Sequence, residues 1–140
     1  MPKPYQCQRR VEFRDTDMAG IVHFSVFFTY MEAAEHEFLR SVGLGVFNEV
    51  GGENLSWPRV AASCNYRSAI RFEDEIEIQV SIEKLGNSSV TYKHEMYRGD
   101  VLVADGSMTT VCCKVEHGKR PESVPLPAAF IEKLKPHVSG

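Results

Sequence analysis

Two carboxylates and a glycine lie close together near the start of the chain, directly before a long apolar segment. Asp15 and Asp17 end a strand-like run, Gly20 follows three residues later, and helical periodicity begins at about Phe24. The first turn of a helix carries backbone N–H groups without an intrahelical partner, and such groups stabilise anions and polarised carbonyl oxygens. A carboxylate a few residues upstream can act on the carbon of the same carbonyl. This arrangement indicates acyl transfer or hydrolysis.

The elements that must hold these residues follow from the spacing of apolar side chains. Residues from Tyr5 to Arg14 alternate with period two, which predicts a half-buried first strand. From about Phe24 to Val42 the apolar residues recur at helical spacing, and Gly43 follows as the expected C-terminal cap. Because the apolar face of this helix is wide and aromatic, we expect the helix to be largely enclosed.

The rest of the chain predicts four further strands and a tail. From Gly45 to Ser56 an irregular loop is expected, because two glycines and scattered polar residues interrupt any periodicity. Alternating apolar residues and short turns then predict an antiparallel meander, with strands at residues 57–66, 75–85, 89–98 and 101–115. The tail, from about residue 118 to 140, is expected to contain a short helix over residues 128–134. The order of strand, helix and four strands predicts a single α+β domain over residues 1–140, with a curved sheet around the helix.

Composition indicates an ordinary globular protein. The 140 residues are 43% hydrophobic and 25% charged, which suits one domain with its own core. The net charge of −3 offers no basic face for nucleic acid. We expect a cytoplasmic protein, because no apolar run is long enough to span a membrane and the first residues lack the apolar core of a signal peptide. The cysteines have no zinc or redox-pair spacing and are expected to be small buried residues. They are Cys7, Cys64, Cys112 and Cys113.

Three runs of residues form a recognisable pattern. They read Asp15-Thr16-Asp17-x-x-Gly20-Ile21-Val22-His23-Phe24, then Tyr30-Met31-Glu32-Ala33-Ala34, then Tyr66-Arg67-Ser68-Ala69-Ile70-Arg71-Phe72-Glu73-Asp74. Together they resemble the hotdog-fold thioesterases of the 4-hydroxybenzoyl-CoA thioesterase family, and the resemblance covers most of the chain. It implies a long helix wrapped by an antiparallel sheet, homodimers that join sheets edge to edge and often pair into homotetramers, and hydrolysis of acyl-CoA without a metal or redox cofactor.

The resemblance assigns roles to individual residues. Asp17 takes the place of the catalytic carboxylate, and the backbone N–H of Phe24 takes the place of the donor that polarises the thioester carbonyl. Asp17 is expected to act either as a nucleophile that forms a mixed anhydride or as a general base that activates water. The residues expected to contact the substrate are Gly20, Ile21, Val22, His23 and Glu32. The helix position of Glu32 is one at which hydroxy-aromatic thioesterases meet the ring hydroxyl.

Several residues have more than one interpretation. Asp15 is expected to hydrogen-bond the backbone of the turn rather than to form a carboxylate pair. His23 is either a residue of the site or a partly exposed polar side chain. Glu32 and His36 are four residues apart, as metal ligands are, but no second cluster of ligands is evident, so no metal is expected. Glu35 stands where related sequences often have arginine.

Two other functions remain open at this point. One is a hotdog module that binds acyl-CoA or an acyl carrier protein without turnover, although pure binding gains nothing from a carboxylate such as Asp17 beside a carbonyl. The other is a dehydratase that uses His23 with Asp17. The sequence also leaves three classes of acyl group possible: aromatic, short aliphatic and long aliphatic. The phosphates of CoA need cationic partners, and the sequence does not rank the candidates Arg59, Arg67, Arg71, Lys119 and Arg120.

Overall fold

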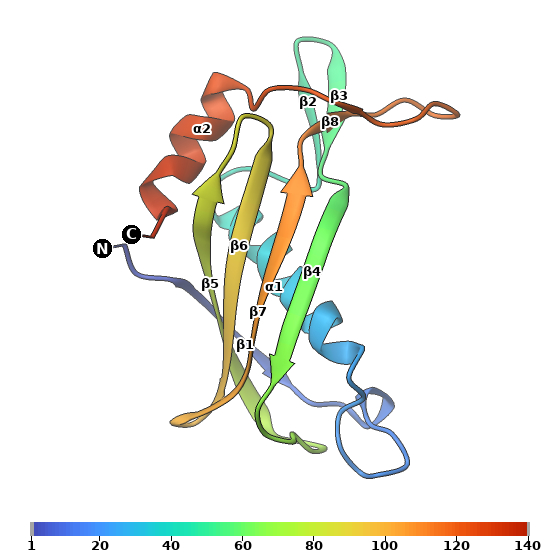
Figure 1. The fold of residues 1–140 in the computed structure, drawn as a ribbon, viewed down its shortest axis with the longest axis vertical. Coiled ribbons are helices and arrows are strands. Elements are labelled where there is room, and N and C mark those ends of the chain that lie inside the picture. The colour runs from blue at the N-terminus through green and yellow to red at the C-terminus, as the bar shows by residue number, and fades with distance from the viewer. Residues whose placement is uncertain (1, 140) are drawn as a thin grey trace.

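A long helix lies against one face of a five-stranded antiparallel sheet in the computed structural model, which describes residues 2–139 (Figure 1). Helix α1 spans Val26–Ser41, and the strand order of the sheet is β1-β5-β6-β7-β4. The strands are β1 (Tyr5–Arg10), β4 (Arg59–Tyr66), β5 (Glu75–Leu85), β6 (Ser89–Arg98) and β7 (Val101–Val111). The predicted order of strand, helix and four strands is confirmed.

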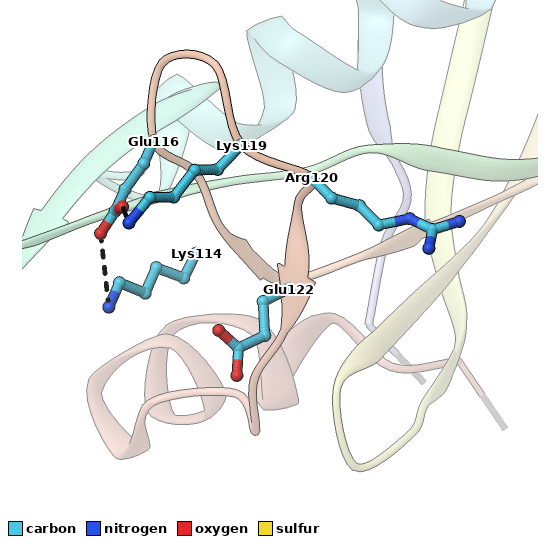
Figure 2. A pocket seen from close by; sticks show the side chains of 5 residues that line it. All are labelled: Lys114, Glu116, Lys119, Arg120 and Glu122. Carbon is cyan, nitrogen blue, oxygen red and sulfur yellow. Dashed lines mark ion pairs between the residues drawn. The ribbon is translucent and has the colours of Figure 1, made fainter.

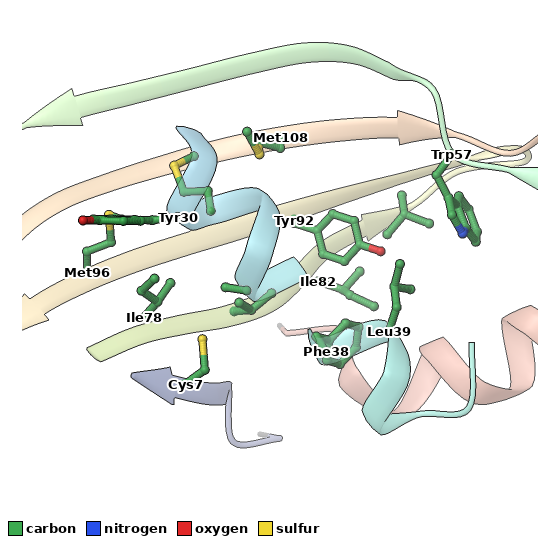
Figure 3. Close-up of a cluster of buried hydrophobic side chains, with 14 of the residues drawn as sticks. Cys7, Tyr30, Phe38, Leu39, Trp57, Ile78, Ile82, Tyr92, Met96 and Met108 are labelled. Atoms are coloured by element: carbon green, nitrogen blue, oxygen red, sulfur yellow. The ribbon is translucent and has the colours of Figure 1, made fainter. Parts of the chain in front are cut away.

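The core lies between α1 and the inner face of the sheet (Figure 3). Period-two alternation along β5 and β6 sends every second side chain inward, and the helical spacing of α1 places one apolar face opposite them. Each large side chain buried in this way stabilises the fold by about 1.5–3 kcal/mol. The buried residues include Phe27, Met31, Ala34 and Phe38 on α1, and Ile76, Ile78, Val80, Ile82, Tyr92 and Met96 on the sheet.

A second, smaller sheet corrects one prediction. Its strand order is β2-β3-β8-β9, with β2 (Phe47–Val50), β3 (Glu53–Ser56), β8 (Cys113–Lys114) and β9 (Glu122–Ser123). The irregular loop predicted from Gly45 to Ser56 is therefore wrong, because most of it forms the hairpin β2–β3. Gly51 and Gly52 make its turn, with φ values of +60° and +82° that favour glycine. The strands are short and mostly exposed, so they show no alternation in the sequence.

Several predicted boundaries move for reasons of pairing. The first strand ends at Arg10 rather than Arg14, because its partner β5 begins at Glu75, opposite Arg10. A 3₁₀ turn, η1 (Phe13–Asp15), follows. The last predicted strand divides at Cys112, whose N–H leaves the β7 ladder and donates to the carbonyl of Ser88 at 2.7 Å.

Strand β4 is an edge strand and is more exposed than its alternation suggests. It pairs with β7 alone, and Val60 and Tyr66 are 63% and 46% exposed. Cys64, on the same strand, is only half-buried, so the prediction of a buried thiol is wrong at this position. It is confirmed for the other three cysteines, Cys7, Cys112 and Cys113.

The tail adds to the sheet at the β1 edge, where it pairs with β5. Helix α2 (Ala128–Leu134) confirms the predicted short helix, and a 3₁₀ turn, η2 (Lys135–His137), follows. Val138 then forms a parallel bridge to Ile82, and the N–H of Ser139 donates to the Ile82 carbonyl at 2.8 Å. Strand β1 pairs with β5 only as far as Val80, so the tail pairs with β5 beyond that point, at Ile82. Among residues 2–139, no helix has the length and apolar character needed to cross a membrane.

Three polar side chains are buried on the inner face of the sheet. Tyr92, His94 and Thr110 each hold polar side-chain atoms away from solvent, and these atoms have no hydrogen-bond partner among residues 2–139. Burial lowers the pKa of His94 to about 4, so the imidazole is neutral at neutral pH. An apolar side chain of similar size is therefore expected to be tolerated at position 94.

We expect acid to destabilise the protein through His94. Its pKa is about 4 in the folded chain and 6.5 in the unfolded chain, so between these values only the unfolded chain takes up the proton. In the wild type, His94 should lower the free energy of unfolding by roughly 2 kcal/mol between pH 7 and pH 5, and the variant His94→Leu should lack this loss. Urea unfolding at the two pH values measures the difference. Because all other titrating groups are present in both proteins, an equal loss in both would contradict the prediction.

Candidate active site

The loop that carries the carboxylates, residues 15–24, is closed by its own backbone and is called the Asp17 loop. Thr16 and Val22 form an isolated antiparallel bridge, and the N–H of Asp17 donates to the carbonyl of Ile21 at 2.9 Å. Gly20 has a φ of +80°, which a residue with a Cβ rarely adopts. The N–H of Val22 donates to the carbonyl of Ile70 at 2.8 Å, which fixes the loop to the segment between β4 and β5.

Asp15 holds this loop to helix α1. One of its carboxylate oxygens accepts hydrogen bonds from the N–H of Glu12 at 2.9 Å and from the hydroxyl of Tyr30 at 2.7 Å. The backbone carbonyl of Asp15 accepts from the N–H of His23 at 3.0 Å. The pKa of Tyr30 is raised, first by burial and then by this bond to Asp15. The expected backbone hydrogen bond of Asp15 is confirmed, while its link to Tyr30 was not predicted.

Asp17 has a different environment, although it lies only two residues away. One carboxylate oxygen accepts the N–H of Ala19 at 2.8 Å, the usual bond of an aspartate in a turn. The other oxygen has no hydrogen-bond partner in the part of the chain that the structure describes. The side chain is exposed. Asp17 is therefore held by the turn and keeps one oxygen available for chemistry.

Phe24 precedes the helix and presents a backbone donor. Helix α1 begins at Val26, two residues later than predicted, and the N–H of Val26 donates to the carbonyl of His23 at 2.9 Å. Within residues 2–139, no acceptor takes the N–H of Phe24. The carbonyl of Phe24 accepts the hydroxyl of Tyr66 at 2.9 Å, which ties the end of β4 to the start of the helix.

Asp17 and Phe24 line the same hollow. Its volume is about 400 Å³, and it opens where the Asp17 loop, the first turn of α1 and the end of β4 meet. Phe27 and Tyr66 meet edge to face in its wall, with ring centroids 4.9 Å apart. The hollow thus brings together two residues that each have a polar group without a partner among residues 2–139, one oxygen of the Asp17 carboxylate and the Phe24 N–H, beside aromatic walls. The lining residues are Asp17, Ile21, Val22, Phe24, Phe27, Tyr66, Arg67, Ser68 and Ala69.

Known proteins match this chain over most of its length. The Thioesterase superfamily matches residues 19–104, more than half of the chain. The chain belongs to this superfamily. Its enzyme class is that of a thioester hydrolase, and the predicted family and hotdog fold are confirmed.

Individual relatives agree with this assignment. A provisionally named esterase of Aquifex aeolicus is 33% identical over 132 residues, which cover 94% of this chain and 98% of that protein. The 4-hydroxybenzoyl-CoA thioesterase of Pseudomonas sp. strain CBS-3 is 25% identical over 138 residues and covers 94% and 98%. The structure of a gentisyl-coenzyme A thioesterase has a TM-score of 0.81 to this chain at 26% identity, over 93% of this chain and 99% of that one.

Three of the five residues expected to contact substrate, Gly20, His23 and Glu32, do not line the hollow of the thioesterase. His23 is half-buried, and its Nδ1 atom lies 2.7 Å from the hydroxyl of Ser25. Glu32 is on α1 and pairs with Arg59 at 3.2 Å. Among the other predicted contacts, Ile21 and Val22 line the hollow, and Gly20 shapes the loop beside it. The substrate-contact roles of all five residues stay predictions.

A buried ion pair that the sequence did not reveal lies further along α1. The carboxylate of Glu35 is 1% exposed and pairs with Arg59 of β4 at 2.7 Å. Burial raises the pKa of Glu35. Both terminal nitrogens of Arg59 contact carboxylates, so this guanidinium is occupied within the chain. The unusual glutamate at position 35 is thus explained by its partner on a strand 24 residues away.

The cationic residues considered as partners for the CoA phosphates lie in different parts of the structure. Arg67 lines the hollow and pairs with Asp105 through its Nε atom at 2.5 Å. Lys119 and Arg120 lie instead in the loop between β8 and β9, at the opposite end of the molecule from the Asp17 loop (Figure 1). There Lys119 pairs with Glu116 at 2.7 Å (Figure 2). Within one chain, Arg67 is therefore the best-placed of these cations. No group of three metal-binding side chains occurs among residues 2–139.

We expect the variant Tyr30→Phe to destabilise the thioesterase by about 1.5–3 kcal/mol, because it removes a hydrogen bond to the carboxylate of Asp15. The matched control is Tyr92→Phe, since the hydroxyl of Tyr92 is buried without a partner and its removal should cost almost nothing. Urea unfolding of the three proteins measures the two effects. Equal destabilisation by both variants would show that the bond between Tyr30 and Asp15 does not hold the loop.

Proposed function

We propose that the protein hydrolyses the thioester of an acyl-CoA to a free acid and CoA, with Asp17 as the catalytic residue and the N–H of Phe24 as the carbonyl donor. The observation that carries this proposal is the shared hollow, where a carboxylate oxygen and a backbone N–H both lack partners among residues 2–139. A thioester carbonyl placed between them would meet an attacking group on carbon and a donor on oxygen.

Asp17 has two chemically balanced routes. As a nucleophile, its free oxygen attacks the carbonyl carbon, the C–S bond breaks and the CoA thiolate leaves with a proton from solvent. Water then cleaves the mixed anhydride and releases the acid and the original carboxylate. As a general base, Asp17 takes a proton from water while the oxygen of that water attacks the same carbon; the C–S bond then breaks, and the proton passes from Asp17 to the departing thiolate, which restores the carboxylate.

Phe24 contributes equally to both routes. Negative charge develops on the carbonyl oxygen when the carbon becomes tetrahedral, and a fixed N–H dipole stabilises it by about 3–4 kcal/mol where one donor has been removed in other enzymes. The hydroxyl of Tyr66 donates to the Phe24 carbonyl, which helps to hold the end of the Asp17 loop against β4. The donor is therefore in position before the substrate arrives.

We infer that the acyl group is aromatic. The hollow is lined by the rings of Phe24, Phe27 and Tyr66, which suit the faces and edges of another ring. The names of two relatives describe thioesterases for 4-hydroxybenzoyl-CoA and gentisyl-coenzyme A. Glu32 remains the predicted partner for a ring hydroxyl.

We further propose that two copies pair through β4. This edge strand exposes unpaired backbone groups and a row of small or apolar residues, Val60, Ala61 and Ala62. Such an edge favours pairing with another strand. Phe24 and Met18, near one end of β4, are 62% and 108% exposed, so a second copy would also cover the rim of the site.

The two alternatives have less support. A binding module without turnover has no use for the free oxygen of Asp17 beside a free donor. A dehydratase would need His23 at the reacting carbons, yet His23 does not line the hollow and its Nδ1 atom is engaged with Ser25.

We expect the variant Asp17→Asn to lose at least roughly two orders of magnitude in kcat, because it removes the nucleophile or base while keeping the bond to Ala19. Release of free thiol from benzoyl-, 4-hydroxybenzoyl-, hexanoyl- and dodecanoyl-CoA measures the activity. The control is Asp100→Asn, an exposed aspartate in the turn between β6 and β7, which should leave kcat unchanged. Full activity in Asp17→Asn would contradict the catalytic role of Asp17. No hydrolysis of any of the four thioesters by the wild type would contradict the proposed function.

We expect the variant Val60→Asp to shift the protein from dimer to monomer, because it places a charge at the β4 edge. Val101→Asp is the matched control, since Val101 is also exposed, at 48% against 63% for Val60, but lies at the start of the inner strand β7. Light scattering after gel filtration measures the mass of each. A wild-type monomer, or a dimer that survives Val60→Asp, would contradict pairing through this edge.

A further inference from the structure

One residue of the hollow, Phe27, lies on the buried face of α1, which packs against the sheet. Phe27 is 3% exposed and forms part of the wall, and Met31 stands one helical turn further on the same face of α1. Met31 is fully buried, at 0% exposed. Any extension of the hollow into the protein along α1 therefore meets Met31 next.

Gly106 of β7 faces Met31 and lets it come unusually close. A Cβ atom at position 106 would lie 2.7 Å from the Cε atom of Met31 and would also clash with the carbonyl oxygen of Ser63, both far inside ordinary contact distance. The missing side chain leaves a space on the inner face of the sheet, and the end of Met31 fills it. Helix and sheet are thus in contact through Met31 with no room between them.

The side chains beyond this contact are not suited to an aliphatic chain. His94 lies opposite Gly106 in the pairing of β6 with β7, and Tyr92 follows one inward position along. Both hold polar atoms without a hydrogen-bond partner among residues 2–139, and Glu35 is buried on the same side of α1. An acyl chain that displaced Met31 would place methylene groups against these polar atoms.

The size of the hollow agrees with this limit. An apolar cavity of about 150 Å³ is enough to bind benzene in another protein. The hollow of about 400 Å³ must also admit the thioester and the start of the pantetheine arm. One ring fits such a space, and a long fatty chain directed into the protein along α1 would need the volume that Met31 occupies.

We propose that Met31, seated on Gly106, is the specificity-determining residue that limits the acyl group to about the size of one ring. This inference rests on the proposed thioesterase function, and it adds the residue that excludes long acyl chains. Met31 makes this contribution by filling space, so its effect should scale with the volume of the side chain at position 31.

The test compares kcat/KM for benzoyl-CoA and dodecanoyl-CoA in the wild type, Met31→Val and Met31→Ala. The wild type should favour benzoyl-CoA by roughly tenfold or more, and this ratio should fall stepwise in the two variants, by roughly tenfold in Met31→Ala, through a gain on the long chain. The control is Leu39→Ala, which opens the core near the far end of α1 and should leave the ratio unchanged. Met31→Val keeps the test open if Met31→Ala does not fold.

Two outcomes would overturn the inference: a wild type that hydrolyses both thioesters equally well, or a ratio that stays the same in both Met31 variants. Failure of the proposed function is recognised separately, as absence of hydrolysis of any thioester. In that event the unreactive thioethers S-benzyl-CoA and S-dodecyl-CoA replace the substrates in calorimetric binding. A preference for S-benzyl-CoA that Met31→Val weakens would support the inference, and its absence would overturn it.

Discussion

Every part of this structure depends on the burial of helix α1 against the curved sheet. The helix has an apolar face too wide to leave in water, and five strands supply the surface that covers it. This burial also decides where the ends of the elements meet. The start of α1 comes out beside the end of β4 and the segment after it, where Val22 bonds Ile70. The hollow is formed at that junction, so the position of the site follows from the packing of the core.

The two carboxylates of the Asp17 loop show how partners decide the role of a side chain. Asp15 accepts hydrogen bonds from Glu12 and Tyr30, and its position is fixed by both. Asp17 makes one bond within its own turn and keeps an oxygen exposed. Asp15 is half-buried and bound to helix α1 through Tyr30, so it stabilises structure, whereas Asp17 is exposed and lines the hollow with Phe24, so it is available to a substrate. The division is consistent with the resemblance, which gives the catalytic role to Asp17.

Periodicity and turn residues predicted the helix, the five main strands and the tail helix, because each has a repeating pattern confined to its own residues. The hairpin β2–β3 was missed because its strands are too short and too exposed to alternate. The pair Glu35–Arg59 and the bond between Tyr30 and Asp15 join residues on different elements. No local pattern in the sequence encodes such contacts. Whether the N–H of Phe24 has an acceptor likewise depends on the residue at which α1 begins, and spacing alone gives that residue only to within about two positions.

The two edges of the main sheet differ in a way that bears on assembly. Strand β1 has only six residues and carries Arg9 and Arg10, and the bridge from Val138 to Ile82 occupies part of the backbone that β1 leaves bare. Strand β4 is longer and, after Arg59 at its start, carries only neutral residues. Short, charged edges resist strand addition. A pair joined through β4 has only β1 at either end, so sheet growth stops at two chains and does not propagate into a filament.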